Sequence, residues 1–298
     1  MILVRLTGGI GNQMFQYAFG RNLAIKNNTI LKLDLTLLEP NHDISKNIVN
    51  RNYSLNIFNI NEFFPKKKEI EYFNGKQYSN KFFKFYNKIR QFYRRKNLII
   101  QKNYGFNPNL LNLKDNKCLV GSWQSYKYFN ENANIIKQEF TFNHMLHDSW
   151  SSTVKDILNN NSICLHIRRG DYISHPDFKK TLGFIGKKYY LNSVKLIKHK
   201  IDNPVLFIFS EDISWCENNL NFDIPFKIVK NNFKDEEAHE HLRLMSLCKN
   251  FIISNSTFAW WAAWLSSNND KIVIAPKKWS KDKTYDTSEL CPPSWNRI

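Results

Sequence analysis

The sequence predicts an α/β protein with parallel sheets, arranged as two Rossmann-like domains. Its 298 residues are about right for two cores of ~150 residues each. Three segments share one plan, in which an apolar β-rich run is followed by a polar or glycine turn and then by a helical pattern. A fourth apolar run also ends in polar residues, and such strand–helix alternation is typical of parallel sheets. We place the domains at residues 1–152 and 153–298.

The first of these segments begins the chain. Residues 2–6 form the apolar run, residues 7–11 are rich in glycine, and a helix is expected from residue 12. Backbone N–H groups at a helix start attract anions, and glycine lets a ligand approach them. The turn fits neither Gly-x-Gly-x-x-Gly nor the phosphate loop that ends in Gly-Lys-Ser/Thr. A purely structural glycine turn therefore stays an alternative.

The second and third segments lie in the later half of the chain. After the run 205–209, Ser210 can cap a helix whose first turn holds Glu211 and Asp212. After the run 251–253, a Ser/Thr cluster precedes an apolar helix from Phe258. The cluster is either an ordinary cap or a ligand site. The helix is too short to span a membrane, and we expect its tryptophans in the core.

The fourth apolar run, residues 162–168, holds the strongest candidate for chemistry. Strand alternation turns Ile163, Leu165 and Ile167 to the core, and His166 and Arg168 to the other face. Ligands of parallel α/β sheets bind beyond the carboxyl ends of the strands. We therefore expect a binding site where this run ends.

Two arginines stand at that end. Arg168 and Arg169 form a planar, permanently charged fork suited to phosphate oxygens, Gly170 permits a tight turn, and Asp171 can hold an arginine in place. A surface ion pair between Arg169 and Asp171 is the alternative. The chain contains no Asp-x-Asp, the pair with which many sugar transferases hold a divalent ion on a diphosphate. This combination predicts a metal-independent transferase for a nucleotide-diphosphate sugar.

Charge and cysteine content narrow the setting. The formal net charge is +17, and residues 1–152 carry 22 Lys and Arg against 10 Asp and Glu. Such a balance indicates an anionic partner. Five scattered cysteines without Cys-x-x-Cys argue against disulfides or zinc and favour a reducing cytoplasm. His239 and His241 do not form the His-Glu-x-x-His zinc pattern.

The segment 79–97 combines basic and aromatic residues in a helical pattern. Its aromatic face either packs in the core or binds the surface of an anionic membrane. The second reading would place the protein in the cytoplasm, peripheral to the inner face of the plasma membrane.

Taken together, four stretches resemble the bacterial α-1,2-fucosyltransferases of glycosyltransferase family 11. They are residues 8–18, 166–172, 209–212 and 254–265, with smaller matches at 121–129 and 275–279. The resemblance implies a GT-B architecture, with two Rossmann-like domains that face each other across a cleft. It also implies inverting, metal-independent transfer of L-fucose from GDP-β-L-fucose to the 2-hydroxyl of a galactose, in an oligosaccharide or a lipid-linked glycan of the kind used in O-antigen biosynthesis.

The resemblance also assigns residues. It implies that residues 1–152 form the acceptor-side domain and residues 153–298 the GDP-fucose-binding domain. It also implies catalytic roles for Arg168, His166, Asp171 and Asn12. The donor-binding residues would be Gly9, Gly11, Asn12, His166, Arg168, Glu211, Asp212, Asn255, Ser256, Thr257 and Phe258. Trp123 and Gln124 are assigned to the acceptor, and no metal or other cofactor is expected.

Some alternatives stay open. His241 stands where the family often carries an aspartate, so a nucleotide contact at that position is in doubt. Asp171 and His166 are candidates for the general base, or the transfer is dissociative and the proton leaves late. Other readings are a fucosyltransferase of another linkage, such as α-1,6, and a nucleic-acid-binding protein.

Overall fold

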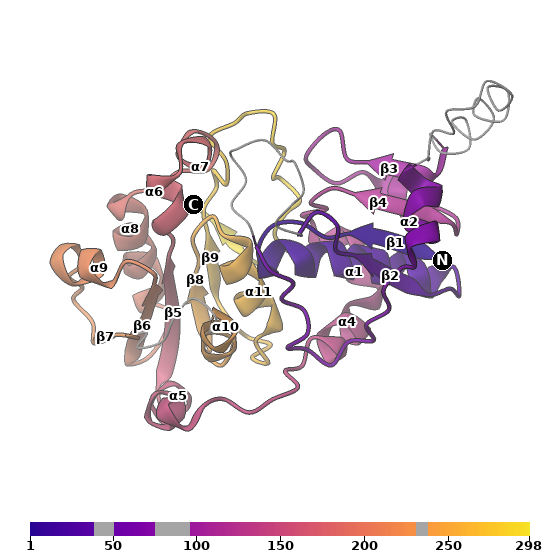
Figure 1. The fold of residues 1–298 in the computed structure, drawn as a ribbon. Helices are drawn as coiled ribbons and strands as arrows, with labels where there is room; N and C mark the ends of the chain where they lie inside the picture. Colours follow the sequence, from indigo (N-terminus) through magenta and orange to yellow (C-terminus); the bar gives the residue numbers. More distant parts are fainter. Residues whose placement is uncertain (39–50, 75–95, 231–237) are drawn as a thin grey trace, which may run out of the picture. The chain divides into compact units, whose positions relative to one another are not determined.

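The computed structural model describes residues 1–38, 51–74, 96–230 and 238–298 (Figure 1). The chain divides into two compact units. The first comprises Met1–Thr141 and Ser288–Leu290, and the second comprises Phe142–Thr287 and Cys291–Ile298. The first unit thus ends before residue 152, where we placed the division and which lies inside helix α5 (Ser151–Asn159).

The first unit is built on a four-stranded sheet in which every pairing is parallel. The strand order is β2-β1-β4-β3. The strands are β1 (Ile2–Arg5), β2 (Leu31–Asp34), β3 (Leu98–Ile100) and β4 (Lys117–Val120). Its α-helices among the described residues are α1 (Ile10–Lys26), α2 (Lys67–Asn74) and α4 (Ala133–Glu139).

Helix α1 lies unusually close to the sheet. A Cβ atom added at Gly20 would come within 2.3 Å of Val4 Cγ2 and 2.8 Å of Leu31 Cδ1. The lack of a side chain therefore lets the helix backbone rest directly on β1 and β2. Its apolar side chains, such as Phe15 and Phe19, are fully buried. The helix begins at Ile10, two residues before the predicted start at residue 12.

The second unit contains a six-stranded sheet, again with only parallel pairings. The strand order is β10-β9-β8-β5-β6-β7. The strands are β5 (Asn161–Ile167), β6 (Pro204–Ser210), β7 (Phe226–Ile228), β8 (Asn250–Ile252), β9 (Val273–Ala275) and β10 (Asn296–Arg297). The predicted α/β class with parallel sheets is confirmed.

Helices cover both faces of this sheet (Figure 1). Helices α8 and α9 lie on one face, and α10 and α11 lie on the other. The helices of the unit, besides α5, are α6 (Gly170–Ser174), α7 (Pro176–Thr181), α8 (Lys187–Lys198), α9 (Ile213–Asn219), α10 (Ala238–Ser246) and α11 (Thr257–Leu265). The alternation in β5 is confirmed, because Ile163, Leu165 and Ile167 share a buried cluster with residues of α8.

Helix α11 is the apolar helix predicted from Phe258. Trp260 and Trp261 are fully buried, which confirms that they belong to the core. Among the residues that the structure describes, no helix combines the length and apolar character needed to cross a membrane. All five cysteines are buried free thiols.

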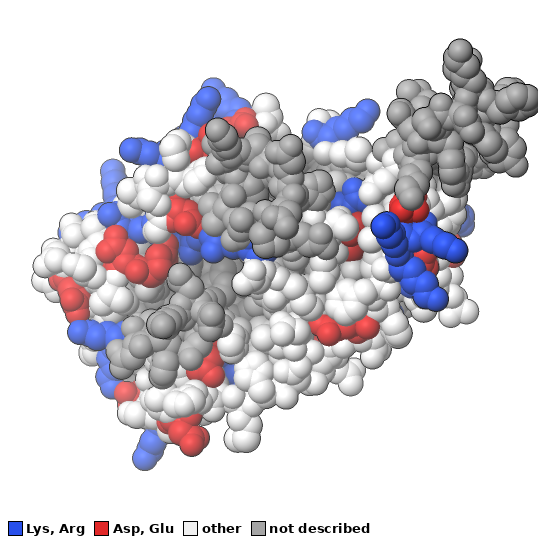
Figure 2. Space-filling view, viewed as in Figure 1, with Lys and Arg blue, Asp and Glu red and all other residues white. Residues whose placement is uncertain are grey.

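The basic aromatic segment 79–97 lies almost entirely outside the described residues. Leu98, the residue directly after that segment, begins strand β3. On the face of the second unit in Figure 2, basic and acidic side chains are interspersed.

Candidate active site

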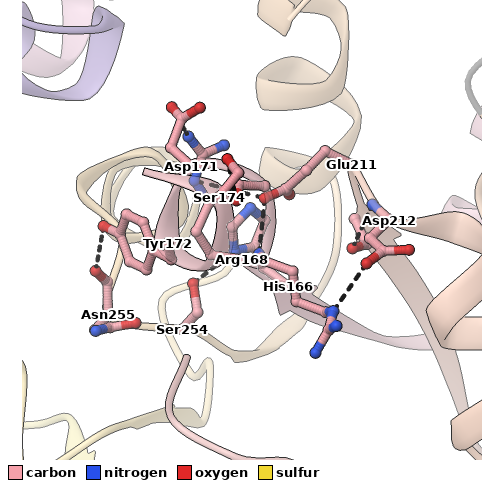
Figure 3. Close-up of polar contacts among 12 residues, drawn as sticks. His166, Arg168, Asp171, Tyr172, Ser174, Glu211, Asp212, Ser254 and Asn255 are labelled. Atoms are coloured by element: carbon pink, nitrogen blue, oxygen red, sulfur yellow. Dashed lines mark hydrogen bonds and ion pairs between the residues drawn. The ribbon is translucent and has the colours of Figure 1, made fainter. Parts of the chain in front are cut away.

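Arg168 follows directly after β5 and is held by two carboxylates. Its Nη2 lies 3.1 Å from Asp171 Oδ2, and its Nε lies 3.6 Å from Glu211 Oε1 (Figure 3). The guanidinium also lies 5.5 Å from the centre of the Tyr172 ring. The side chain keeps 28% of its surface exposed, so a guanidinium fixed from several sides still has a face open to a ligand.

Arg169 has a different environment. Its Nε donates to Asp212 Oδ2 at 2.9 Å, and its guanidinium lies 4.2 Å from the Trp215 ring centre and 4.9 Å from that of Phe184. These rings pack on the α8–α9 side of the sheet, opposite to His166. The two arginines therefore do not form one fork, and the alternative pair between Arg169 and Asp171 is also wrong, because Asp171 pairs with Arg168.

Glu211 and Asp212, at the end of β6, organise this loop. Glu211 Oε1 accepts the Arg169 N–H at 2.7 Å, and Asp212 Oδ1 accepts the Trp215 N–H at 3.0 Å. Asp212 is thus the cap of α9, not Ser210 as expected, and its bond with Arg169 lowers its pKa. A direct role of either carboxylate in donor binding stays a prediction.

His166 is a buried, neutral imidazole beside Arg168. Its Nδ1 lies 2.8 Å from Ser254 Oγ (Figure 3), and its ring centre lies 5.9 Å from that of Phe258. Burial, together with the positive charges of Arg168 and His241, lowers the pKa of His166 to about 3. Ser254 was not among the predicted site residues. β5 and β8 are neighbouring parallel strands, with Leu165 opposite Ile252, so the Ser/Thr cluster that follows β8 lies beside the end of β5. That cluster was the signal in the sequence that could have suggested Ser254.

The start of α11 supplies the other side of this site. Ser256 is the N-cap without a side-chain cap bond, and the first turn of α11 contains no acidic residue. Thr257 and Phe258 occupy that turn. The backbone N–H groups in the first turn of a helix and the positive end of its dipole favour an anion.

Asn255 has a structural role. It is 1% exposed, and its Nδ2 donates to the carbonyl oxygens of Gly183 at 3.3 Å and Trp279 at 3.1 Å. Its own carbonyl accepts the Tyr172 hydroxyl at 3.0 Å (Figure 3). Tyr172 therefore ties the arginine loop to the start of α11, a contact that no sequence pattern predicted.

In the first unit, the turn between β1 and α1 brings together two predicted residues. Gln124 Nε2 donates to Asn12 Oδ1 at 3.1 Å. Gly8 has φ +75°, and a Cβ there would lie 2.5 Å from Asn12 Nδ2. Gly9 is the N-cap of α1 with open space where a Cβ would stand, whereas Gly11 is buried in the first turn.

Trp123, which was predicted to contact the acceptor, does not lie at the surface of the protein. Its side chain is fully buried and packs against Phe19 and Tyr128, with ring centres 5.1 Å and 6.0 Å away. A side chain without exposed surface cannot contact an acceptor in this conformation. Trp123 therefore belongs to the core of the first unit, and Gln124 is the residue of that pair that remains near Asn12.

The predicted residues thus form two groups. One surrounds the end of β5 and the start of α11 in the second unit, and the other surrounds the start of α1 in the first unit. Each group places permanent or partial positive charge at the carboxyl end of a parallel strand. This arrangement is typical of proteins that bind a phosphorylated ligand.

Comparison with known proteins agrees with that class. The model of the family described as Glycosyl transferase family 11 matches residues 99–298. An alpha-1,2-colitosyltransferase of Escherichia coli is 32% identical over 100% of this chain and 99% of its own length. The O-antigen biosynthesis glycosyltransferase WbnK of Escherichia coli is 34% identical over 97% and 98%. Galactoside alpha-(1,2)-fucosyltransferase 2 of Mus musculus is 25% identical over 52% of this chain and 45% of its own.

The fold, the site and these relatives define a glycosyltransferase. The chain belongs to glycosyl transferase family 11.

Proposed function

We propose that this glycosyltransferase transfers L-fucose from GDP-β-L-fucose to the 2-hydroxyl of a galactose residue, with inversion and without a metal ion in the transfer step. The observation that carries the proposal is Arg168, a half-buried guanidinium fixed by Asp171 and Glu211. It stands at the end of β5, in the same site as the start of α11. Relatives named as α-1,2-transferases support the choice of the 2-hydroxyl as the acceptor group.

Arg168 would bind the diphosphate of the donor. Each charge-assisted hydrogen bond to phosphate contributes roughly 1.5–3 kcal/mol. Because charge grows on the leaving diphosphate as the sugar departs, a fixed guanidinium stabilises the transition state more than the ground state. The N–H groups at the start of α11, near Thr257 and Phe258, would add to this.

His166 and Asp171 then act chiefly by position. A histidine whose pKa is about 3 accepts a proton poorly at neutral pH, and Asp171 is paired with Arg168. We therefore favour a dissociative transfer in which the bond to the diphosphate breaks early and the acceptor hydroxyl loses its proton late, to water. From the first unit, Asn12 and Gly9 would contact the donor and Gln124 the acceptor.

A second candidate donor is GDP-colitose, because an alpha-1,2-colitosyltransferase matches the whole chain. Colitose is L-fucose without its 3-hydroxyl. A site that hydrogen-bonds a substrate hydroxyl can reject the analogue lacking it by about 10⁴-fold, whereas a site that leaves room for a hydroxyl discriminates far less. In a competition, strong preference for GDP-fucose therefore indicates a fucose site, whereas comparable use of both donors or a preference for GDP-colitose indicates a colitose site.

The deciding experiment offers the purified protein GDP-fucose or GDP-colitose with a terminal β-galactoside, in the presence of EDTA, and determines the product linkage. A matched acceptor, the 2-deoxygalactoside, serves as the control. We expect an α-1,2-linked fucoside with the first acceptor and none with the second. An α-1,6 product, equal transfer to the 2-deoxy acceptor, or transfer that EDTA abolishes while the protein stays folded would each contradict one part of the proposal.

The natural acceptor would be a lipid-linked glycan of O-antigen biosynthesis, as the relative WbnK suggests. Such an acceptor would bring the enzyme to the cytoplasmic face of the membrane. Sedimentation with anionic and with neutral liposomes tests this contact. We expect salt-sensitive binding to the anionic vesicles alone.

A further inference from the structure

A cluster of two histidines and one glutamate lies apart from the arginine site. His144 precedes α5, while His239 and Glu240 belong to the first turn of α10. One ligand atom of each residue lies within 4.8 Å of the other two. The sequence had drawn attention to His239 and His241, but the structure separates them, because His241 turns toward Phe209 and Trp150.

Glu240 is the unusual member of the cluster. Only 6% of its surface is exposed, and its Oε1 accepts the His147 N–H at 3.0 Å. Its Oε2 is buried and has no hydrogen-bond partner among the described residues. A buried carboxylate oxygen without a partner costs free energy that a bound cation would offset.

The two histidines face each other and this carboxylate. Their ring centres are 4.9 Å apart with an interplanar angle of 77°. His144 Nδ1 lies 3.0 Å from Asn143 Oδ1, and a hydrogen bond of this kind leaves Nε2 with its lone pair available. The backbone is fixed as well, since Arg243 Nη1 donates to the His144 carbonyl.

We propose that His144, His239 and Glu240 bind a divalent transition-metal ion, with Zn²⁺ as the best match. Two imidazoles and one carboxylate are a common zinc ligand set that leaves a fourth position for water. Ligand atoms around tetrahedral zinc stand roughly 3.3 Å apart, so modest rotations of the half-buried histidines complete the site. Arg243 is a positive neighbour, but its guanidinium is turned to a carbonyl and to the Phe142 ring.

The ion would tie residues 142–147 to α10. That helix also carries His241, whose ring packs on Phe209 of β6. The metal therefore acts on stability, at a place distinct from Arg168, and the inference does not depend on the identity of the sugar donor.

Zinc titration of metal-free protein tests the site. We expect calorimetry with ZnCl₂ to show one saturable site in the wild type, and zinc to raise the Tm. His144→Ala and His239→Ala should each weaken zinc binding at least about tenfold. His199→Ala, which removes an exposed histidine at the end of α8, should bind as the wild type does.

Glu240→Gln separates loss of the ligand from loss of the fold, because it keeps the shape of the side chain. It should retain the wild-type circular dichroism spectrum while it loses most of the zinc-dependent rise in Tm. Unchanged zinc affinity in the double variant His144→Ala/His239→Ala would overturn the proposal, as would the absence of saturable binding in the wild type.

Discussion

The adjacent arginines at the end of β5 lie in different environments, and we expect them to have different functions. Arg169 is enclosed by Trp215, Phe184 and Asp212, so it holds the loop. Arg168 keeps an open face between Asp171 and Glu211, so it can meet a ligand. Conservative substitutions should distinguish these two functions.

Arg168→Lys should reduce transfer by about 10- to 100-fold with little change in the Tm. Lysine keeps the positive charge but loses the planar fork, and one lost charge-assisted hydrogen bond amounts to roughly 1.5–3 kcal/mol. The measurement is kcat/KM for the sugar nucleotide together with thermal unfolding. Near-wild-type transfer would remove Arg168 from its proposed role.

Arg169→Lys is the matched control and should behave in the opposite way. It loses stacking on two rings, which is about 1–2 kcal/mol at a partly buried site. We expect a lower free energy of unfolding in urea and a smaller loss of activity than in Arg168→Lys. A stable but inactive Arg169→Lys would mean that both arginines contact the donor.

At the scale of the element, helix α1 offers two glycines with different surroundings. Gly9 faces open space at the N-cap, and a Cβ there meets nothing within 4 Å. Gly9→Ala should therefore leave the Tm nearly unchanged. If a ligand approaches this backbone, the added methyl group should raise KM for the donor several-fold.

Gly20→Ala should have the opposite effect. Alanine favours helix by about 1 kcal/mol over glycine, but the new Cβ would meet Val4 Cγ2 at 2.3 Å. Overpacking of this kind costs roughly 1–3 kcal/mol. We expect a net loss of stability in urea unfolding with KM unchanged, and a net gain would show that the helix can move away from the sheet.

Sequence reasoning found β5, β6 and β8 of the second sheet because their apolar runs end in polar turns. It did not predict β7, β9 and β10, which are strands of only two or three residues. It also found the faces of β5, since alternation fixes them. It missed Ser254 as the partner of His166 and the contacts of Arg169 and Asp212, because these depend on which strands are neighbours and on the direction that a side chain takes after the end of its strand. Trp123 was misassigned because a tryptophan next to Gln124 reads equally well as surface or core.

For the whole molecule, buried histidines predict acid sensitivity. Burial lowers the pKa of His166 to about 3 and that of His241 to about 4, below the ordinary value near 6.5. Between these values the unfolded chain binds protons that the folded chain does not. The free energy of unfolding should therefore decrease as the pH is lowered through 6.5 toward 4. Between pH 7.5 and pH 5.5, the two values to be compared, we expect a loss of about 1 kcal/mol per histidine.

His241→Phe isolates one of these contributions. Phenylalanine can occupy the place beside Trp150 and Phe209, whose ring centres lie 5.6 Å and 5.8 Å from His241. Urea unfolding at the two pH values should show a smaller acid-dependent loss than in the wild type. An identical loss in both proteins would mean that His241 is protonated in the folded state.

The chain passes between its two units more than once, and this limits how relatives can exchange parts. Residues Ser288–Leu290 belong to the first unit, where the Glu289 carbonyl accepts the Ser125 hydroxyl and its carboxylate pairs with Lys127. The residues that follow return to the second unit and end in β10. Consider a chimera that takes residues up to Thr141 from one relative and all later residues from another. Its first unit would then contain residues 288–290 from the wrong relative. We expect chimeras of family members with different acceptors to fold stably only when residues 288–290 come from the same relative as residues 1–141.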